Sequence, residues 1–168
     1  ALDPHTASDD ELRARAAAAA DQPALRWRDE PRATCLDLLF SLEVEPRLPS
    51  GAVFVTDYPA CQAALARVVP GADGVPVARR FAVFLDRVEL ANGYWELTDA
   101  DEQRRRFAAD RRLRTALGKT TPPDDDRLLA ALDAGLAPCA GVALGVDRLL
   151  MNLLGAGHIR EVVAFADD

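Results

Sequence analysis

The stretch that decides the fold is Gly141-Val142-Ala143-Leu144-Gly145-Val146-Asp147-Arg148-Leu149. Two glycines flank an apolar run, and leucines then follow at helical spacing, so the pattern predicts a β-strand that turns directly into a helix. Glycine allows close approach of a ligand to the backbone, and a helix N-terminus attracts anions. Arg148 adds a planar cation suited to stacking on a base or binding a phosphate. The simpler interpretation is a tight turn with Asp147 as N-cap and no ligand.

The second informative stretch is residues 81–98, an apolar segment that contains Glu89, Asn92 and Glu96. Burying a carboxylate in an apolar strand is costly unless the charge is paired. Two carboxylates with an amide between them therefore indicate a site for a cation, either a metal ion or an ammonium group. The alternative is a sheet with one wet face, on which these groups bind nothing. Asn92-Gly93 is also a frequent hairpin-turn dipeptide.

The remaining sequence predicts a helical first part and a mixed second part. Helices are expected over residues 10–20, capped by Ser8 or Asp9, and from Pro31 towards Pro46. Residues 43–51 form a connector. Strands are expected over residues 53–56, 79–86 and 88–97, the last two joined by a tight turn at Asp86-Arg87. Residues 61–69 are expected to be helical, and residues 70–76 form a Gly/Pro loop.

The longest expected helix starts at a capping box over residues 98–101 and ends before Gly118. Its arginines follow acidic residues at a spacing of four, which stabilises an isolated helix by about 0.2–0.5 kcal/mol for each pair. The expected pairs are Asp101–Arg105, Glu102–Arg106 and Asp110–Arg114. We expect a solvated, self-paired face, and the alternative is a basic surface for an acidic macromolecular partner.

Composition excludes several classes of protein. The net charge of −7 argues against a protein that holds duplex nucleic acid by neutralising phosphates. Cys35, Cys61 and Cys139 are isolated and odd in number, so neither a disulfide framework nor a zinc site is expected. No apolar run is long enough to span a membrane and no signal peptide is visible, so we expect a cytoplasmic location.

Two segments together resemble the catalytic core of class II lysyl-tRNA synthetases. These are Glu89-Leu-Ala-Asn92-Gly93-Tyr94-Trp-Glu96-Leu-Thr-Asp99 and the stretch from Gly141 to Arg148, and residues 54–60 resemble the strand and turn ahead of them. The resemblance implies an α+β fold, an antiparallel sheet flanked by helices. Residues 1–50 are then a helical lead-in segment, and residues 51–168 are the C-terminal half of the core.

Within that family the likeness is greatest to the stand-alone members, which lack an anticodon-binding domain and attach β-lysine to elongation factor P. Three features favour them: the Glu-Leu-Ala-Asn-Gly run that starts at Glu89, the turn over residues 59–63, and Ala143, where tRNA-charging relatives have glycine. A lysyl-tRNA synthetase core that charges tRNA remains an alternative. A second alternative is a non-catalytic paralogue that binds a nucleotide or a partner.

The resemblance implies that ATP and a lysine-type substrate form an aminoacyl-adenylate, with Mg²⁺ bridging the phosphates. Arg148 corresponds to the catalytic arginine that lies over the adenine and reaches the γ-phosphate. Glu89 corresponds to the carboxylate that binds Mg²⁺, and Gly145 to the glycine under the nucleotide.

The resemblance also assigns the amino-acid pocket. Asn92 corresponds to a contact with the substrate carboxylate, and Tyr94 to an aromatic wall that is usually Phe in relatives. Glu96 corresponds to the acid that receives the side-chain ammonium. A methyl group at Ala143 narrows the floor of the pocket, which would distinguish α- from β-amino acids by shape, on the order of 1–3 kcal/mol.

Two departures from the family pattern matter. Seven residues before Glu89, relatives carry a second metal-binding acid where this chain has Ala82, and this substitution is the best support for a non-catalytic paralogue. The family's first and second motifs are also absent. We therefore expect a C-terminal fragment of a longer enzyme, inactive alone, whose parent forms a homodimer through the missing N-terminal motif.

Overall fold

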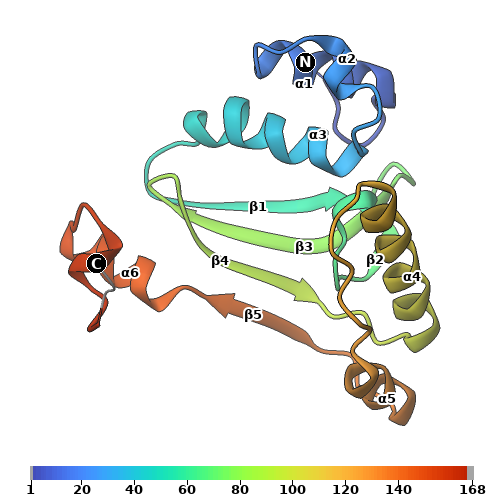
Figure 1. Cartoon of the computed structure of the whole chain (residues 1–168). Helices are drawn as coiled ribbons and strands as arrows, with labels where there is room; N and C mark the ends of the chain where they lie inside the picture. The colour runs from blue at the N-terminus through green and yellow to red at the C-terminus, as the bar shows by residue number, and fades with distance from the viewer. Residues whose placement is uncertain (1, 166–168) are drawn as a thin grey trace.

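The fold is built on a five-stranded antiparallel sheet, which the computed structural model shows within its described residues, 2–165 (Figure 1). The strands are β1 (Ala52–Pro59), β2 (Val68–Pro70), β3 (Pro76–Leu85), β4 (Val88–Trp95) and β5 (Ala140–Leu144). The order across the sheet is β1-β3-β4-β5, and β2 pairs with the first residues of β3. The expected strands and the α+β class are confirmed.

The turn between β3 and β4 is the tight turn that the sequence predicts. Asp86 and Arg87 have φ values of 48° and 70°, the left-handed conformation of a two-residue hairpin turn whose twist matches the strands. An oxygen of the Asp86 carboxylate accepts a hydrogen bond from the backbone N–H of Gly51 at 2.8 Å. The Asp86 side chain therefore stabilises the hairpin end.

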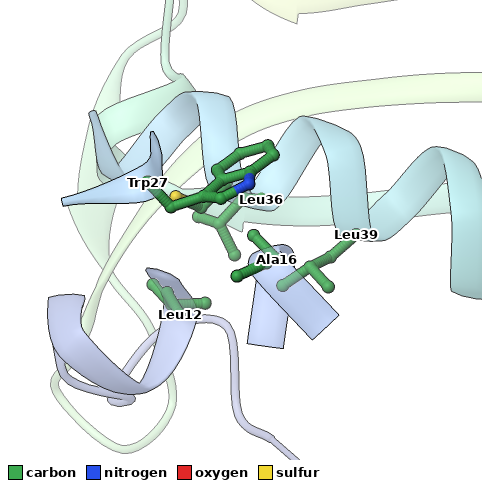
Figure 2. Close-up of a cluster of buried hydrophobic side chains, with 7 residues drawn as sticks. Leu12, Ala16, Trp27, Leu36 and Leu39 are labelled. Carbon is green, nitrogen blue, oxygen red and sulfur yellow. The ribbon is translucent and has the colours of Figure 1, made fainter. Parts of the chain in front are cut away.

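Three helices precede the sheet: α1 (Asp9–Ala19), α2 (Ala24–Trp27) and α3 (Arg32–Leu39). α3 continues into a π-helical turn, η1 (Phe40–Val44), and a 3₁₀ turn, η2 (Glu45–Arg47). Ser8 caps α1 in a full capping box with Glu11. Figure 2 shows the apolar cluster that joins these helices, and Figure 1 shows α3 running alongside β1. The labelled members of the cluster are Leu12, Ala16, Trp27, Leu36 and Leu39.

The helix expected over residues 61–69 is wrong. The chain instead forms a 3₁₀ turn, η3 (Ala60–Gln62), and then enters β2. Ala64 has a φ of 48°, which ends any helix there. The guanidinium of Arg106 donates hydrogen bonds to the carbonyls of Ala64 and Ala66 at 2.9 and 2.8 Å. A tertiary contact therefore overrides the local helical preference.

The longest helix is α4 (Ala100–Ala116), and α5 (Asp126–Ala134) follows it. Asp99 caps α4 through the N–H of Glu102, whose side chain pairs with arginines instead of completing a capping box. The pairs Glu102–Arg106 and Asp110–Arg114 are confirmed, whereas Asp101 pairs with Arg104 rather than with Arg105. Arg111 pairs with Asp124. The self-paired interpretation of this face is therefore the better one.

An apolar surface is exposed on one face of the sheet and on the last long helix, α6 (Val146–Leu154). The sheet contributes Phe54, Trp95, Val142 and Leu144, and α6 contributes Leu153 and Leu154, which are 70% and 68% exposed. Exposed apolar side chains of this kind favour association. The last element of the described part is η4 (Ile159–Glu161). Within residues 2–165 no helix is long and apolar enough to cross a membrane.

We predict that the double variant Leu153→Glu/Leu154→Glu lowers self-association of the purified chain without lowering its thermal unfolding midpoint. Both side chains are mostly exposed, so the substitutions remove apolar surface and few packing contacts. Sedimentation velocity and circular dichroism measure the two quantities. The control is Leu129→Glu, which places a charge at a buried position of α5 and should lower the unfolding midpoint. Unchanged association of the double variant would contradict the prediction.

Candidate active site

The candidate site lies on one face of β4. Asn92 is paired in register with Ala82 of β3, and Tyr94 is paired with Arg80. Side chains directly opposite each other in an antiparallel pair share a face, so Asn92 and Tyr94 point the same way. Glu96 is two residues after Tyr94, and because side chains of an extended chain alternate between faces, it points the same way as Tyr94. We call the face that carries Glu89, Asn92, Tyr94 and Glu96 the site face.

Glu89 joins this face because the strand register shifts. It lies three residues before Asn92, and simple alternation would place the two side chains on opposite faces. The β3–β4 pairing shifts between Val83 and Phe84, so that Phe84 pairs with Glu89. Phe84 and Ala82 share a face of β3, and Glu89 is therefore brought to the face of Asn92. A bulge of this kind redirects a side chain at the cost of one unpaired residue.

Glu89 and Asn92 contact each other directly. The Nδ2 amide of Asn92 donates a hydrogen bond to Oε1 of Glu89 at 3.3 Å. The Oδ1 atom of Asn92 is buried and has no hydrogen-bond partner within residues 2–165. A buried amide oxygen without a partner lowers stability.

β5 borders the site next to β4, and its residues there have small side chains or none. Ala143 pairs with Asn92, and Gly141 pairs with Tyr94. A Cβ atom at Gly141 would collide with the carboxylate of Glu96, so glycine is what leaves room for that carboxylate over the strand. Ala143 therefore lies next to Asn92, as a pocket-floor residue would.

Arg148 reaches the site from the first turn of α6. Gly145 is the N-cap of α6, and its N–H donates to the carbonyl of Leu90 at 2.8 Å, which attaches the helix start to the beginning of β4. The Nη1 atom of Arg148 donates to the carbonyl of Glu89 at 3.0 Å. Asp147 makes no capping bond, so its expected role as an N-cap is wrong. Arg148 is exposed and is thus accessible to a ligand.

A cavity of about 910 Å³ lies beside the site face, between the sheet and the segment α3–η1. Glu89 lines it together with Tyr58, Arg80 and Phe84, whereas the other predicted site residues do not. Burial raises the pKa of Tyr58, and the nearby Arg80 partly offsets this effect. Tyr58 and Arg80 were not identified from the sequence, since nothing local marks a tyrosine or an arginine in a strand as part of a site.

The polar groups on the site face fit a Mg²⁺ ion only if the protein supplies part of its ligands and a nucleotide and water supply the rest. Ala82, opposite Asn92, is 1% exposed and offers no ligand atom. Within residues 2–165 no group of three or more His, Cys, Asp or Glu side chains is placed to hold a metal. Glu89 provides one carboxylate. Because Mg²⁺ is often held by one or two carboxylates together with phosphate oxygens and water, this donor set fits an ion that arrives with a nucleotide.

The sheet, with its site face and the strand-to-helix turn that carries Arg148, is the arrangement of a class II synthetase core. Residues 19–168 match the family described as tRNA synthetases class II (D, K and N). The chain belongs to this family.

Among curated proteins, the elongation factor P–(R)-β-lysine ligase of Klebsiella pneumoniae subsp. pneumoniae is 48% identical over 99% of this chain. The ligases of the same name from Proteus mirabilis and Salmonella arizonae are 47% and 45% identical over 98% and 99% of the chain. The chain covers 51%, 50% and 51% of these three proteins, so it spans about half the length of the relatives it matches.

We predict that Gly93→Ala destabilises the protein by about 1–3 kcal/mol, because the new Cβ would collide with the Phe81 ring and lie 2.8 Å from the Gly141 carbonyl. The matched control is Gly145→Ala, whose Cβ would make only ordinary contacts of 3.5 Å or more. Urea-induced unfolding measures both. Equal stability of the two variants would contradict the close β3–β4–β5 packing that supports the site face.

Proposed function

We propose that this chain carries the C-terminal part of the active site of an ATP-dependent lysine-activating ligase that acts on elongation factor P. The observation that carries the proposal is the contact between Glu89 and Asn92 on one face of β4, to which the Arg148 side chain is hydrogen-bonded. Glu96 follows directly after β4, and its carboxylate lies over Gly141, the residue paired with Tyr94. The relatives named elongation factor P–(R)-β-lysine ligase support the choice of substrates.

In this proposal the nucleotide lies at the junction of β5 and α6. Gly145 allows close approach, and the N-terminus of α6 offers unpaired N–H groups to phosphate. Arg148 stacks on the base and reaches the terminal phosphate, two tasks that a planar guanidinium performs. Glu89 would hold Mg²⁺, which would supply positive charge next to the phosphates.

The amino acid lies along the rest of the site face. Glu96 binds the side-chain ammonium, because its carboxylate lies over Gly141 with no side chain in between. Asn92 donates to the substrate carboxylate through the Nδ2 hydrogen that does not bond Glu89, and Tyr94 forms the aromatic wall. Ala143 limits the space beside Asn92, which supports a preference for β-lysine by shape.

The reaction has two steps. A carboxylate oxygen of the amino acid attacks the α-phosphorus of ATP, the bond to pyrophosphate breaks, and an aminoacyl-adenylate forms. A nucleophile of the acceptor then attacks the acyl carbon, and AMP leaves. These side chains act by positioning the reactants and stabilising charge, without a covalent enzyme intermediate.

The proposal also covers the acceptor of the activated amino acid and the oligomeric state of the full-length protein. We expect transfer to elongation factor P rather than to tRNA, in the cytoplasm, by a homodimer of the full-length protein. Transfer of the activated amino acid to each acceptor, measured with the full-length gene product, distinguishes the two. Charging of tRNA without modification of elongation factor P would favour the tRNA synthetase alternative.

A non-catalytic protein that binds a nucleotide is the second candidate. Ala82 favours it, because the residue opposite Asn92 adds no charge to the site. Under this alternative the full-length gene product binds ATP but catalyses no amino-acid-dependent exchange of pyrophosphate into ATP. Under the ligase proposal it catalyses that exchange.

We predict that Glu96→Gln raises the KM for the amino acid about 10- to 100-fold in this exchange, with the KM for ATP nearly unchanged. The substitution keeps the shape of the side chain but removes the charge that pairs with the ammonium. The matched control is Asp101→Asn, the same change on the exposed side of α4. A parallel rise in both KM values, or an effect of equal size in the control, would contradict the assignment of Glu96.

A further inference from the structure

Arg80 lies on the site face but has no part in the proposed chemistry. The central carbon of its guanidinium is 4.5 Å from the ring centroid of Tyr58 and 5.9 Å from the ring centroid of Tyr94. These are the only two tyrosines in the sequence. A guanidinium at these distances attracts the face of an aromatic ring. One arginine thus connects a tyrosine that lines the cavity to the tyrosine beside Asn92.

A bulge in β1 places Tyr58 next to Arg80. The β1–β3 register shifts between Thr56 and Tyr58, and Asp57 at the shift has a φ of 54°. Without the shift, alternation would turn Asp57 towards the site face and Tyr58 away from it. Asp57 instead pairs with Arg79 at 2.8 Å, and Tyr58 faces Arg80. A strained backbone position of this kind persists only where its surroundings hold it.

The Arg80 side chain is also fixed at its far end. Its Nη1 atom donates to the carbonyl of Gln62 at 3.2 Å. The side-chain amide of Gln62 donates in turn to Asp37 of α3 at 2.7 Å. Arg80 is therefore attached to η3 and, through Gln62, to the helical segment that forms the other wall of the cavity.

Tyr94 packs against the buried cluster of Ala63, Ala66 and Ala78. Its two cross-strand neighbours in the sheet are unequal. On β3 the directly paired residue is Arg80, and on β5 it is Gly141, which has no side chain. The ring of Tyr94 is thus held from the β3 side. The opposite side is left open for the Glu96 carboxylate.

We infer that Arg80 is a positioning residue, which holds the Tyr94 wall of the amino-acid pocket by stacking between Tyr58 and Tyr94. The inference rests on the proposed function for the identity of the pocket. The stacking of Arg80 with the two tyrosines does not depend on the proposed function. Two experiments therefore test the inference and the proposed function separately.

The first experiment measures the stack without activity. Ultraviolet absorbance follows phenolate formation in wild type, Arg80→Met and Arg80→Lys, and Tyr58→Phe and Tyr94→Phe assign the signals. The charged and titratable groups facing Tyr58 are Arg80, Glu89, Asp37 and Tyr94. Arg80 lowers the pKa of Tyr58, so its replacement by Met should raise the Tyr58 midpoint. The same midpoint in wild type and Arg80→Met would overturn the inference.

The second experiment measures exchange of pyrophosphate into ATP by the full-length gene product. Arg80→Met and Arg80→Lys should each raise the KM for the amino acid about tenfold and leave the KM for ATP unchanged. Lys keeps the charge but not the planar stack, so wild-type behaviour of Arg80→Lys would overturn the inference. In a double-mutant cycle with Tyr94→Leu, the Arg80→Met effect should largely disappear, and full additivity would also overturn it.

The matched control is Arg67→Met, which removes a guanidinium 4.9 Å from the ring centroid of Trp95, next to Tyr94 in β4. Trp95 faces away from the site, so neither KM should change. A rise in the amino-acid KM of this control equal to that of Arg80→Met would indicate a general effect on the sheet and overturn the inference. Absence of exchange in wild type would count against the proposed function, while the phenolate titration would still test the contact between Arg80 and Tyr58.

Discussion

The candidate site depends on one feature of the sheet, the register shift between β3 and β4. Glu89 and Asn92 are separated by three residues, a spacing that normally divides two side chains between opposite faces. The shift at Val83 and Phe84 brings them to one face, where the Asn92 amide contacts the Glu89 carboxylate. Without it, the carboxylate assigned to the metal would lie on the far side of the sheet from the residues assigned to the amino acid.

Three neighbouring elements, β5, α6 and the segment α3–η1, determine how much space lies next to the site face. β5 contributes Gly141, which has no side chain, and Ala143, which has only a methyl group, so space is left above the strand. The start of α6 is attached to β4 through Leu90 and places Arg148 beside Glu89. On the other side, the segment α3–η1 forms the wall of a cavity that reaches Glu89. The site face is therefore bordered by β5 and α6 on one side and by the cavity beside α3–η1 on the other.

Much of this fold is predictable from the sequence, for reasons that are local. The Asp86-Arg87 turn, the Ser8 cap and the strand-to-helix turn at Gly145 each follow from residues within a few positions. The segment 61–69 was not predictable, because Arg106, some forty residues later, takes the carbonyls that a helix would need. The roles of Tyr58 and Arg80 also escaped prediction, since they depend on a bulge that only the paired strand defines.

The central claim is that the site face of β4 binds a lysine-type amino acid beside a nucleotide. The most direct test is a crystal structure of the full-length gene product with a non-hydrolysable lysyl-adenylate analogue. The account predicts the side-chain ammonium at hydrogen-bond distance, about 3 Å, from the Glu96 carboxylate, and the adenine against Arg148. An analogue bound elsewhere, or one whose ammonium points away from Glu96, would contradict it.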